Sequence, residues 1–138
     1  MSSYTEPLAY RSTDIWRNGR RLYQVLAGFS FASDLFQMKV EVPTGFRTDL
    51  GSIPALVRWW LSPDAPYAQA YVVHDRLYAI QADREMADMI LWEALGLPYR
   101  VYDETGAMHR VTCPVLKRVA IYWAVRIGGG PAYRRHGN

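Results

Sequence analysis

Residues 68–80 form the segment that most constrains how this chain can fold. In a helix turning about 100° per residue, this segment has only two clearly solvated positions, Gln69 and Arg76. They lie seven residues apart and point almost the same way. His74 lies about 200° around the helix from Arg76 and is therefore predicted to point into the core.

Two ionisable residues interrupt this apolar helix. Asp75, next to His74, is predicted to be half buried, and Tyr78 is placed to cover the His74 ring. Neighbouring side chains on a helix diverge by about 100°, so His74 and Asp75 cannot form one hydrogen-bonded pair. His74 is either a satisfied core residue or a base that a distant carboxylate orients. Asp75 would then bind a cation or a structural donor.

Asp88 and Asp49 are the candidate carboxylates for orienting His74. Asp88 follows His74 by 14 residues on the next predicted helix, which suits two antiparallel helices; alternatively it is a surface residue paired with Arg84. Asp49 lies in a loop before a predicted helix start. The alternative for Asp49 is a cap that accepts hydrogen bonds from the amides that follow it.

Other kinds of site have less support. One histidine with two or three aspartates would suit calcium, magnesium or manganese better than zinc. Ser52 precedes a predicted helix but lies outside the GxSxG pattern of serine hydrolases. The single cysteine, Cys113, excludes an internal disulfide and a zinc site of the Cys type.

The first third of the chain predicts antiparallel strands. Asn18-Gly19 is the strongest short hairpin signal, and it separates the strand-like segments 13–17 and 20–26 through a type I′ turn. Residues 36–42 alternate between apolar and polar, as a half-buried strand requires.

Helical periodicity dominates the remainder. We expect a short helix over 52–61, then helices over 68–80 and 84–95, a hairpin over 99–111, and a last helix from near 112 to 127. The class is α+β, with an N-terminal antiparallel β-meander followed by helices, a second small hairpin and a C-terminal helix. The 138 residues form one domain: 1–42 strand-rich, 52–95 helical with the candidate site, 99–127 hairpin plus helix, and 128–138 a flexible basic tail.

Charge and hydropathy exclude several classes of protein. The net charge of +3 is spread along the chain, and Arg134-Arg135-His136 is better explained as a solvated terminus than as a nucleic-acid arm. The N-terminus lacks the basic start and apolar run of a secretory signal. No run of about 18 apolar residues occurs, so we expect no membrane span and no secretion by a signal peptide.

Three segments together resemble an uncharacterised family of bacteriophage and prophage proteins. They are Val42-Pro43-x-Gly45-Phe46-x-Thr48-Asp49-x-x-Ser52-Ile53-Pro54, then Ala70-x-x-Val73-His74-Asp75-x-Leu77-Tyr78, then Ala87-Asp88. The resemblance covers roughly residues 40–95. It implies a phage origin, other phage proteins as partners, and a location in the virion or the host cytoplasm, but no settled activity.

The His-Asp-x-x-Tyr run followed by Ala-Asp is also similar to the core of secreted phospholipases A and of the parvovirus capsid phospholipase. If the roles of the matching phospholipase residues apply here, the resemblance implies that His74 activates water and that Asp88 orients His74. It also implies that Asp75 binds calcium or another divalent cation and that Tyr78 supports the pair of His74 and Asp88. The chain departs from these enzymes at residues 45–51, where their glycine-rich calcium loop has a different pattern.

Three functions follow as expectations. The first is a virion or tail-associated accessory or assembly protein, in which His74, Asp49, Asp75 and Asp88 form a polar cluster that fixes the fold. The second is a metal-assisted, phospholipase-like hydrolase of a host envelope component, with His74 as general base. The third is a phage inhibitor of a host defence protein.

Overall fold

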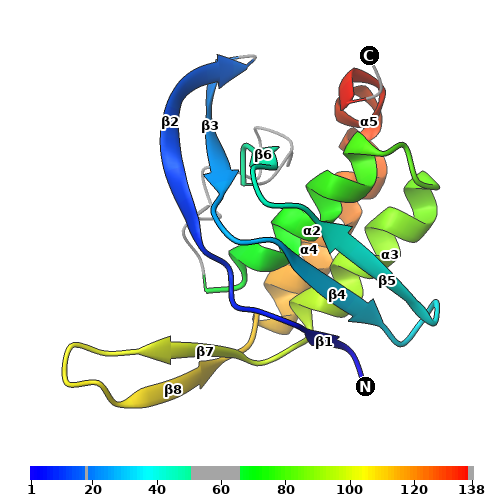
Figure 1. Cartoon of the computed structure of the whole chain (residues 1–138). Helices are drawn as coiled ribbons and strands as arrows, with labels where there is room; N and C mark the ends of the chain where they lie inside the picture. Colours follow the sequence, from blue (N-terminus) through cyan, green and yellow to red (C-terminus); the bar gives the residue numbers. More distant parts are fainter. Residues whose placement is uncertain (18, 51–65, 137–138) are drawn as a thin grey trace.

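The computed structural model describes residues 1–17, 19–50 and 66–136. Figure 1 shows two small sheets on one side of a group of helices, with a separate hairpin that extends away from the body. Strands come first and helices follow, so the α+β class is confirmed.

The first sheet has the order β2-β3-β6 and is antiparallel. Its strands are β2 (Tyr10–Arg17), β3 (Arg20–Val25) and β6 (Arg47–Thr48). Arg17 pairs with Arg20 across the predicted hairpin, and Gly19 has a positive φ of 76°. Asn18 lies outside the described residues, so the type of this turn stays a prediction.

The second sheet has the order β1-β4-β5, from β1 (Ser3–Tyr4), β4 (Phe29–Ser33) and β5 (Met38–Val42). Its buried residues alternate as the sequence predicts, with Phe31 opposite Val40 in the core. The predicted meander is thus divided into two sheets. The chain crosses between them at Gly28, where a Cβ atom would lie 2.9 Å from the Thr44 amide nitrogen.

Four helices are described: α2 (Ala68–Ala79), α3 (Arg84–Leu95), α4 (Val115–Gly128) and α5 (Gly130–His136). Pro114 is the N-cap of α4, so this helix begins at Val115 and not near residue 112 as the sequence predicts. Within the segment predicted as a flexible basic tail, residues 130–136 form α5. The Tyr133 hydroxyl of α5 donates to the Ala82 carbonyl, and this contact holds the segment against the turn between α2 and α3.

Helix α2 is the centre of the molecule and contacts α3, α5, β5 and β6. His74 is buried, as predicted, with 3% of its surface exposed. Gln69 was expected to be solvated, but this prediction is wrong, because its amide donates to the Glu6 carbonyl and lies buried beneath the N-terminal segment. Asp75 is completely buried and not half buried.

The hairpin consists of β7 (Tyr99–Tyr102) and β8 (Met108–Val111). Asp103 closes its turn by accepting hydrogen bonds from the amides of Thr105 and Ala107. Cys113, between the hairpin and α4, is a buried free thiol. No helix among the described residues is both long and apolar enough to cross a bilayer. The predicted helix over 52–61 lies outside the described residues.

Candidate functional site

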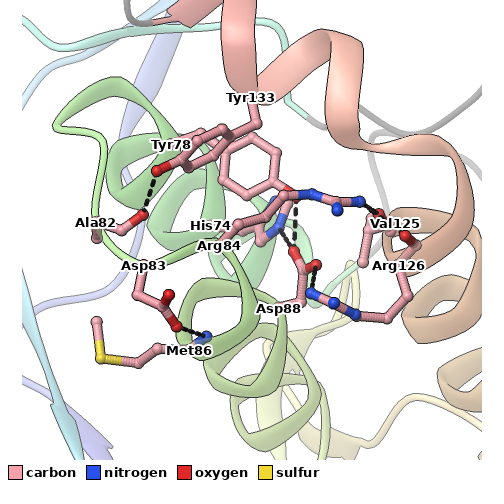
Figure 2. Close-up of polar contacts among 10 residues, drawn as sticks. All are labelled: His74, Tyr78, Ala82, Asp83, Arg84, Met86, Asp88, Val125, Arg126 and Tyr133. Atoms are coloured by element: carbon pink, nitrogen blue, oxygen red, sulfur yellow. Dashed lines mark hydrogen bonds and ion pairs between the residues drawn. The ribbon is translucent and has the colours of Figure 1, made fainter.

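The carboxylate of Asp88 is the centre of a buried polar cluster at the meeting point of three helices. Its Oδ1 atom lies 2.7 Å from His74 Nε2 and 2.7 Å from the Tyr78 hydroxyl, and its Oδ2 atom accepts a 2.9 Å hydrogen bond from Arg126 (Figure 2). Asp88 is fully buried. We call these four residues the Asp88 cluster.

The local sequence explains why these side chains meet. His74 and Tyr78 are four residues apart and so share one face of α2. The turn at residues 80–83 reverses the chain, and the Asp83 side chain caps α3 by accepting a hydrogen bond from the Met86 amide. This cap places Asp88 in the second turn of α3, opposite His74.

Asp88 is ionised in the folded protein. Burial favours the neutral acid and raises its pKa, but the hydrogen bonds from His74, Tyr78 and Arg126 outweigh burial, so the net pKa is lowered. An ionised carboxylate can only accept hydrogen bonds. His74 Nε2 therefore carries a hydrogen and donates a hydrogen bond to Asp88, and Nδ1 is the ring nitrogen that does not contact this carboxylate.

Tyr78 closes one side of the cluster. Its ring centroid lies 4.2 Å from that of His74, as the sequence predicts, and it meets the Tyr133 ring of α5 edge to face. Burial and the hydrogen bond to Asp88 both raise the pKa of Tyr78, which keeps the hydroxyl protonated as a donor. A Cβ atom on Gly129 would lie only 2.9 Å from this hydroxyl, so the close approach requires glycine.

Arg84 and Arg126 join the cluster to α4. Arg84, the first residue of α3, donates 2.7 Å hydrogen bonds to the carbonyls of Val125 and Arg126 near the C-terminal end of α4. A cation at the C-terminal end of a helix is favourable, because the last carbonyls lack helical partners. Arg84 therefore does not pair with Asp88 along α3, which was the alternative from the sequence.

The two candidate aspartates are now distinguished by their partners. Asp88 is hydrogen-bonded to His74, whereas Asp49 Oδ2 forms an ion pair with Arg20 of β3 at 3.2 Å. The expected cluster of His74 with both Asp49 and Asp88 is therefore not what the described contacts show. Ser52 lies outside the described residues.

Asp75 lies beside His74 on α2 and is fully buried. Within the described ranges, no three His, Cys, Asp or Glu side chains are grouped closely enough to hold a metal ion. A role for Asp75 as a calcium ligand stays a prediction.

Sequence reasoning missed Arg126 and Tyr133. Arg126 lies 38 residues after Asp88, in a helix whose face toward α3 could not be chosen from its nearly uniform apolar pattern. Tyr133 lies in a segment that its neighbouring glycines marked as flexible.

The chemistry of this arrangement is limited by burial. A carboxylate that fixes the tautomer of a histidine is the arrangement found beside general bases. A base must also reach its substrate within hydrogen-bonding distance, and only 3% of the His74 surface is exposed.

Comparisons with known proteins place the chain in a family without assigning an activity. No curated protein and no solved structure matches the chain. The model of the family described as "Protein of unknown function (DUF1353)" matches residues 23–125, which include His74, Tyr78 and Asp88 but not Arg126. Because this match spans most of the sequence, the chain belongs to the DUF1353 family.

Proposed function

We propose that this protein is a bacteriophage accessory or assembly protein, associated with the virion or tail, and that the Asp88 cluster is a structural tie between its helices. The observation that carries the proposal is the burial of the cluster: His74 is 3% exposed and Asp88 is not exposed at all. The phage origin follows from the sequence resemblance.

The contacts of the cluster favour a structural role. Its hydrogen bonds join α2 to α3 and α3 to α4, and Tyr133 adds α5 through its ring contact with Tyr78. Three donors satisfy the carboxylate of Asp88, so burial of its charge is compensated. A cluster used in this way supports an accessory or assembly role, in which the surface of the protein would bind its partners.

Replacement of His74 tests the structural role. In a His74→Gln variant we expect the melting temperature to fall by about 10 °C, because Asp88 loses one of its charge-assisted partners. His109→Gln is the matched control, since His109 is 59% exposed and pairs with Asp103 at the surface. A His74→Gln variant as stable as the control would contradict a structural cluster.

Mass spectrometry of purified particles tests the location. We expect the protein among the virion components of the phage that encodes it. Its absence from particles, together with its presence in infected cells, would contradict the virion role and favour an inhibitor of a host protein.

The geometry around His74 also favours a second candidate, a metal-assisted, phospholipase-like hydrolase of a host envelope component. The bond from Nε2 to Asp88, with the Tyr78 hydroxyl on the same oxygen, leaves Nδ1 as the atom that would accept a proton from water. These are the roles that the phospholipase resemblance implies for His74, Asp88 and Tyr78. The described residues offer no grouped set of metal donors.

Fatty-acid release from phosphatidylglycerol vesicles, with and without millimolar calcium, tests this candidate. The hydrolase requires release that His74→Gln abolishes, and a calcium-dependent rise in melting temperature, because an ion that binds only the folded state stabilises it. No release by the wild-type protein and no thermal shift would exclude it.

A further inference from the structure

Helix α4 is apolar on the side that faces away from the protein. Five large apolar side chains on this side are exposed: Val115 by 69%, Leu116 by 81%, Val119 by 38%, Trp123 by 56% and Ile127 by 83%. The opposite side of the same helix carries fully buried residues and packs against α3. A helix that is apolar on both sides is normally covered on both.

Four of these side chains form a narrow band. At 100° per residue, Leu116, Val119, Trp123 and Ile127 fall within about 80° of one another around the helix axis. Their spacing of three, four and four residues is that of a helix surface that packs against a second helix. We call these four residues the outer stripe.

The outer stripe is distinctive within the described part of the chain. No helix other than α4 exposes a large apolar side chain within its bounds there. Contiguous exposed apolar surface of this kind marks interaction sites in soluble proteins.

The charged residues of α4 itself are all cationic, whereas Asp88 and Glu85 of α3 lie near Arg126. All 13 acidic residues of the chain lie at or before Glu104. The Lys and Arg residues after that point are Arg110, Lys117, Arg118, Arg126, Arg134 and Arg135. On the helical projection, Lys117 and Arg126 fall on opposite sides of the outer stripe. Arg126 keeps 26% of its side chain exposed while it binds Asp88.

We propose that the outer stripe of α4 docks an acidic amphipathic helix of a partner protein. The apolar face of that helix would cover Leu116, Trp123 and Ile127, and its flanking Asp or Glu residues would face Lys117 and Arg126. This inference deepens the proposed function, because an assembly protein needs a binding surface, and it names the chemistry of the partner.

Two other occupants are disfavoured. A second copy docked α4 against α4 would gain no ion pair between the two helices, because every charged residue of α4 is cationic. A lipid surface requires no particular spacing of apolar side chains, whereas the outer stripe has the three-four-four spacing of a helix that packs against a second helix.

Binding of two labelled 21-residue peptides, followed by fluorescence anisotropy, tests the proposal. Both peptides carry leucine at the helix contact positions; one has glutamate at the flanking positions and the other has lysine. We expect saturable binding of the glutamate peptide and at least tenfold weaker binding of the lysine peptide. Equal binding of the two peptides, or no binding of the glutamate peptide, would overturn the proposal.

Matched variants locate the binding. The double variant Leu116→Gln/Ile127→Gln should bind the glutamate peptide at least tenfold more weakly, and Leu26→Gln, at a residue 51% exposed outside α4, should bind it like the wild type. Unchanged binding by the double variant would refute docking at α4.

Two further measurements identify a different occupant. A dimer in sedimentation velocity that the double variant dissociates would assign the stripe to a second copy. Pelleting with phosphatidylglycerol vesicles that the double variant loses would assign it to lipid. Either result would overturn the partner-helix proposal. Mass spectrometry of purified particles tests the proposed function independently. Wild-type protein found in particles would support that function even if the peptides fail to bind.

Discussion

Asp88 Oδ1 lies 2.7 Å from His74 Nε2, on the helix that follows the one carrying His74. Both side chains are buried, and the same oxygen also accepts the Tyr78 hydroxyl. The pair therefore links α2 to α3 through a carboxylate that accepts hydrogen bonds from three donors. The free energy of unfolding of the protein should therefore depend on the Asp88 carboxylate more than on any one of its three donors.

We predict that Asp88→Asn destabilises the protein by about 3 kcal/mol, because it removes the negative charge that compensates Arg126 and accepts from His74. Urea unfolding followed by circular dichroism measures the free energy of unfolding. Asp14→Asn is the control, since Asp14 is fully exposed and its ion pair with Arg21 is long at 3.4 Å. A loss no larger than that of the control would contradict the central role of Asp88.

The same residue predicts an acid dependence of stability. Its pKa in the folded protein is lowered below the unfolded value of about 3.9. The resulting stabilisation is complete above the unfolded pKa and is lost as the pH falls through the folded pKa. The difference in unfolding free energy between wild type and Asp88→Asn should thus shrink between about pH 5 and pH 3.

Taking the difference in unfolding free energy between wild type and Asp88→Asn cancels the contributions that other carboxyl groups make to its pH dependence. Asp103 is one of these, since hydrogen bonds from Thr105 and His109 lower its pKa to about 2. A difference that stays constant over this pH range would show that the pKa of Asp88 is the same in the folded and the unfolded protein.

Tyr78→Phe should cost about 1–2 kcal/mol of unfolding free energy, less than Asp88→Asn, because the carboxylate keeps two of its donors. The ring, which packs on His74 and Tyr133, is retained. Tyr102→Phe is the control at a residue 63% exposed. Thermal and urea unfolding of the three proteins give the comparison, and a Tyr78→Phe protein as stable as wild type would mean that its hydroxyl bond adds nothing.

The elements that the sequence predicted are those with local signals. Asn18-Gly19 predicted a hairpin, and Arg17 pairs with Arg20. The periodicity of residues 68–80 predicted a helix, and α2 spans Ala68–Ala79. The division into two sheets could not be predicted, because it depends on pairings such as β1 with β4 between distant segments.

The residues of the candidate site also differ in whether a local sequence signal predicts their contacts. The 14-residue spacing from His74 to Asp88 fits an antiparallel helix pair, so this partner could be proposed in advance. The burial of Gln69 could not, since its amide binds the carbonyl of Glu6, 63 residues away. Arg126 carries no local signal either, because only the packing of α4 on α3 brings it to Asp88.

Glu93 of α3 provides a polar link between a helix and a sheet, which sequence patterns could not predict. Its carboxylate accepts hydrogen bonds from the Ser33 hydroxyl and from the amides of Asp34 and Leu35 in the β4–β5 turn. We predict that Glu93→Gln lowers the unfolding free energy by about 2 kcal/mol, since the amide group replaces one acceptor oxygen with a donor that faces other donors. The control is Glu104→Gln in the exposed hairpin turn. Hydrogen exchange should locate the effect: faster exchange of the Asp34 and Leu35 amides is expected, and unchanged exchange there would show that Glu93 does not hold the turn.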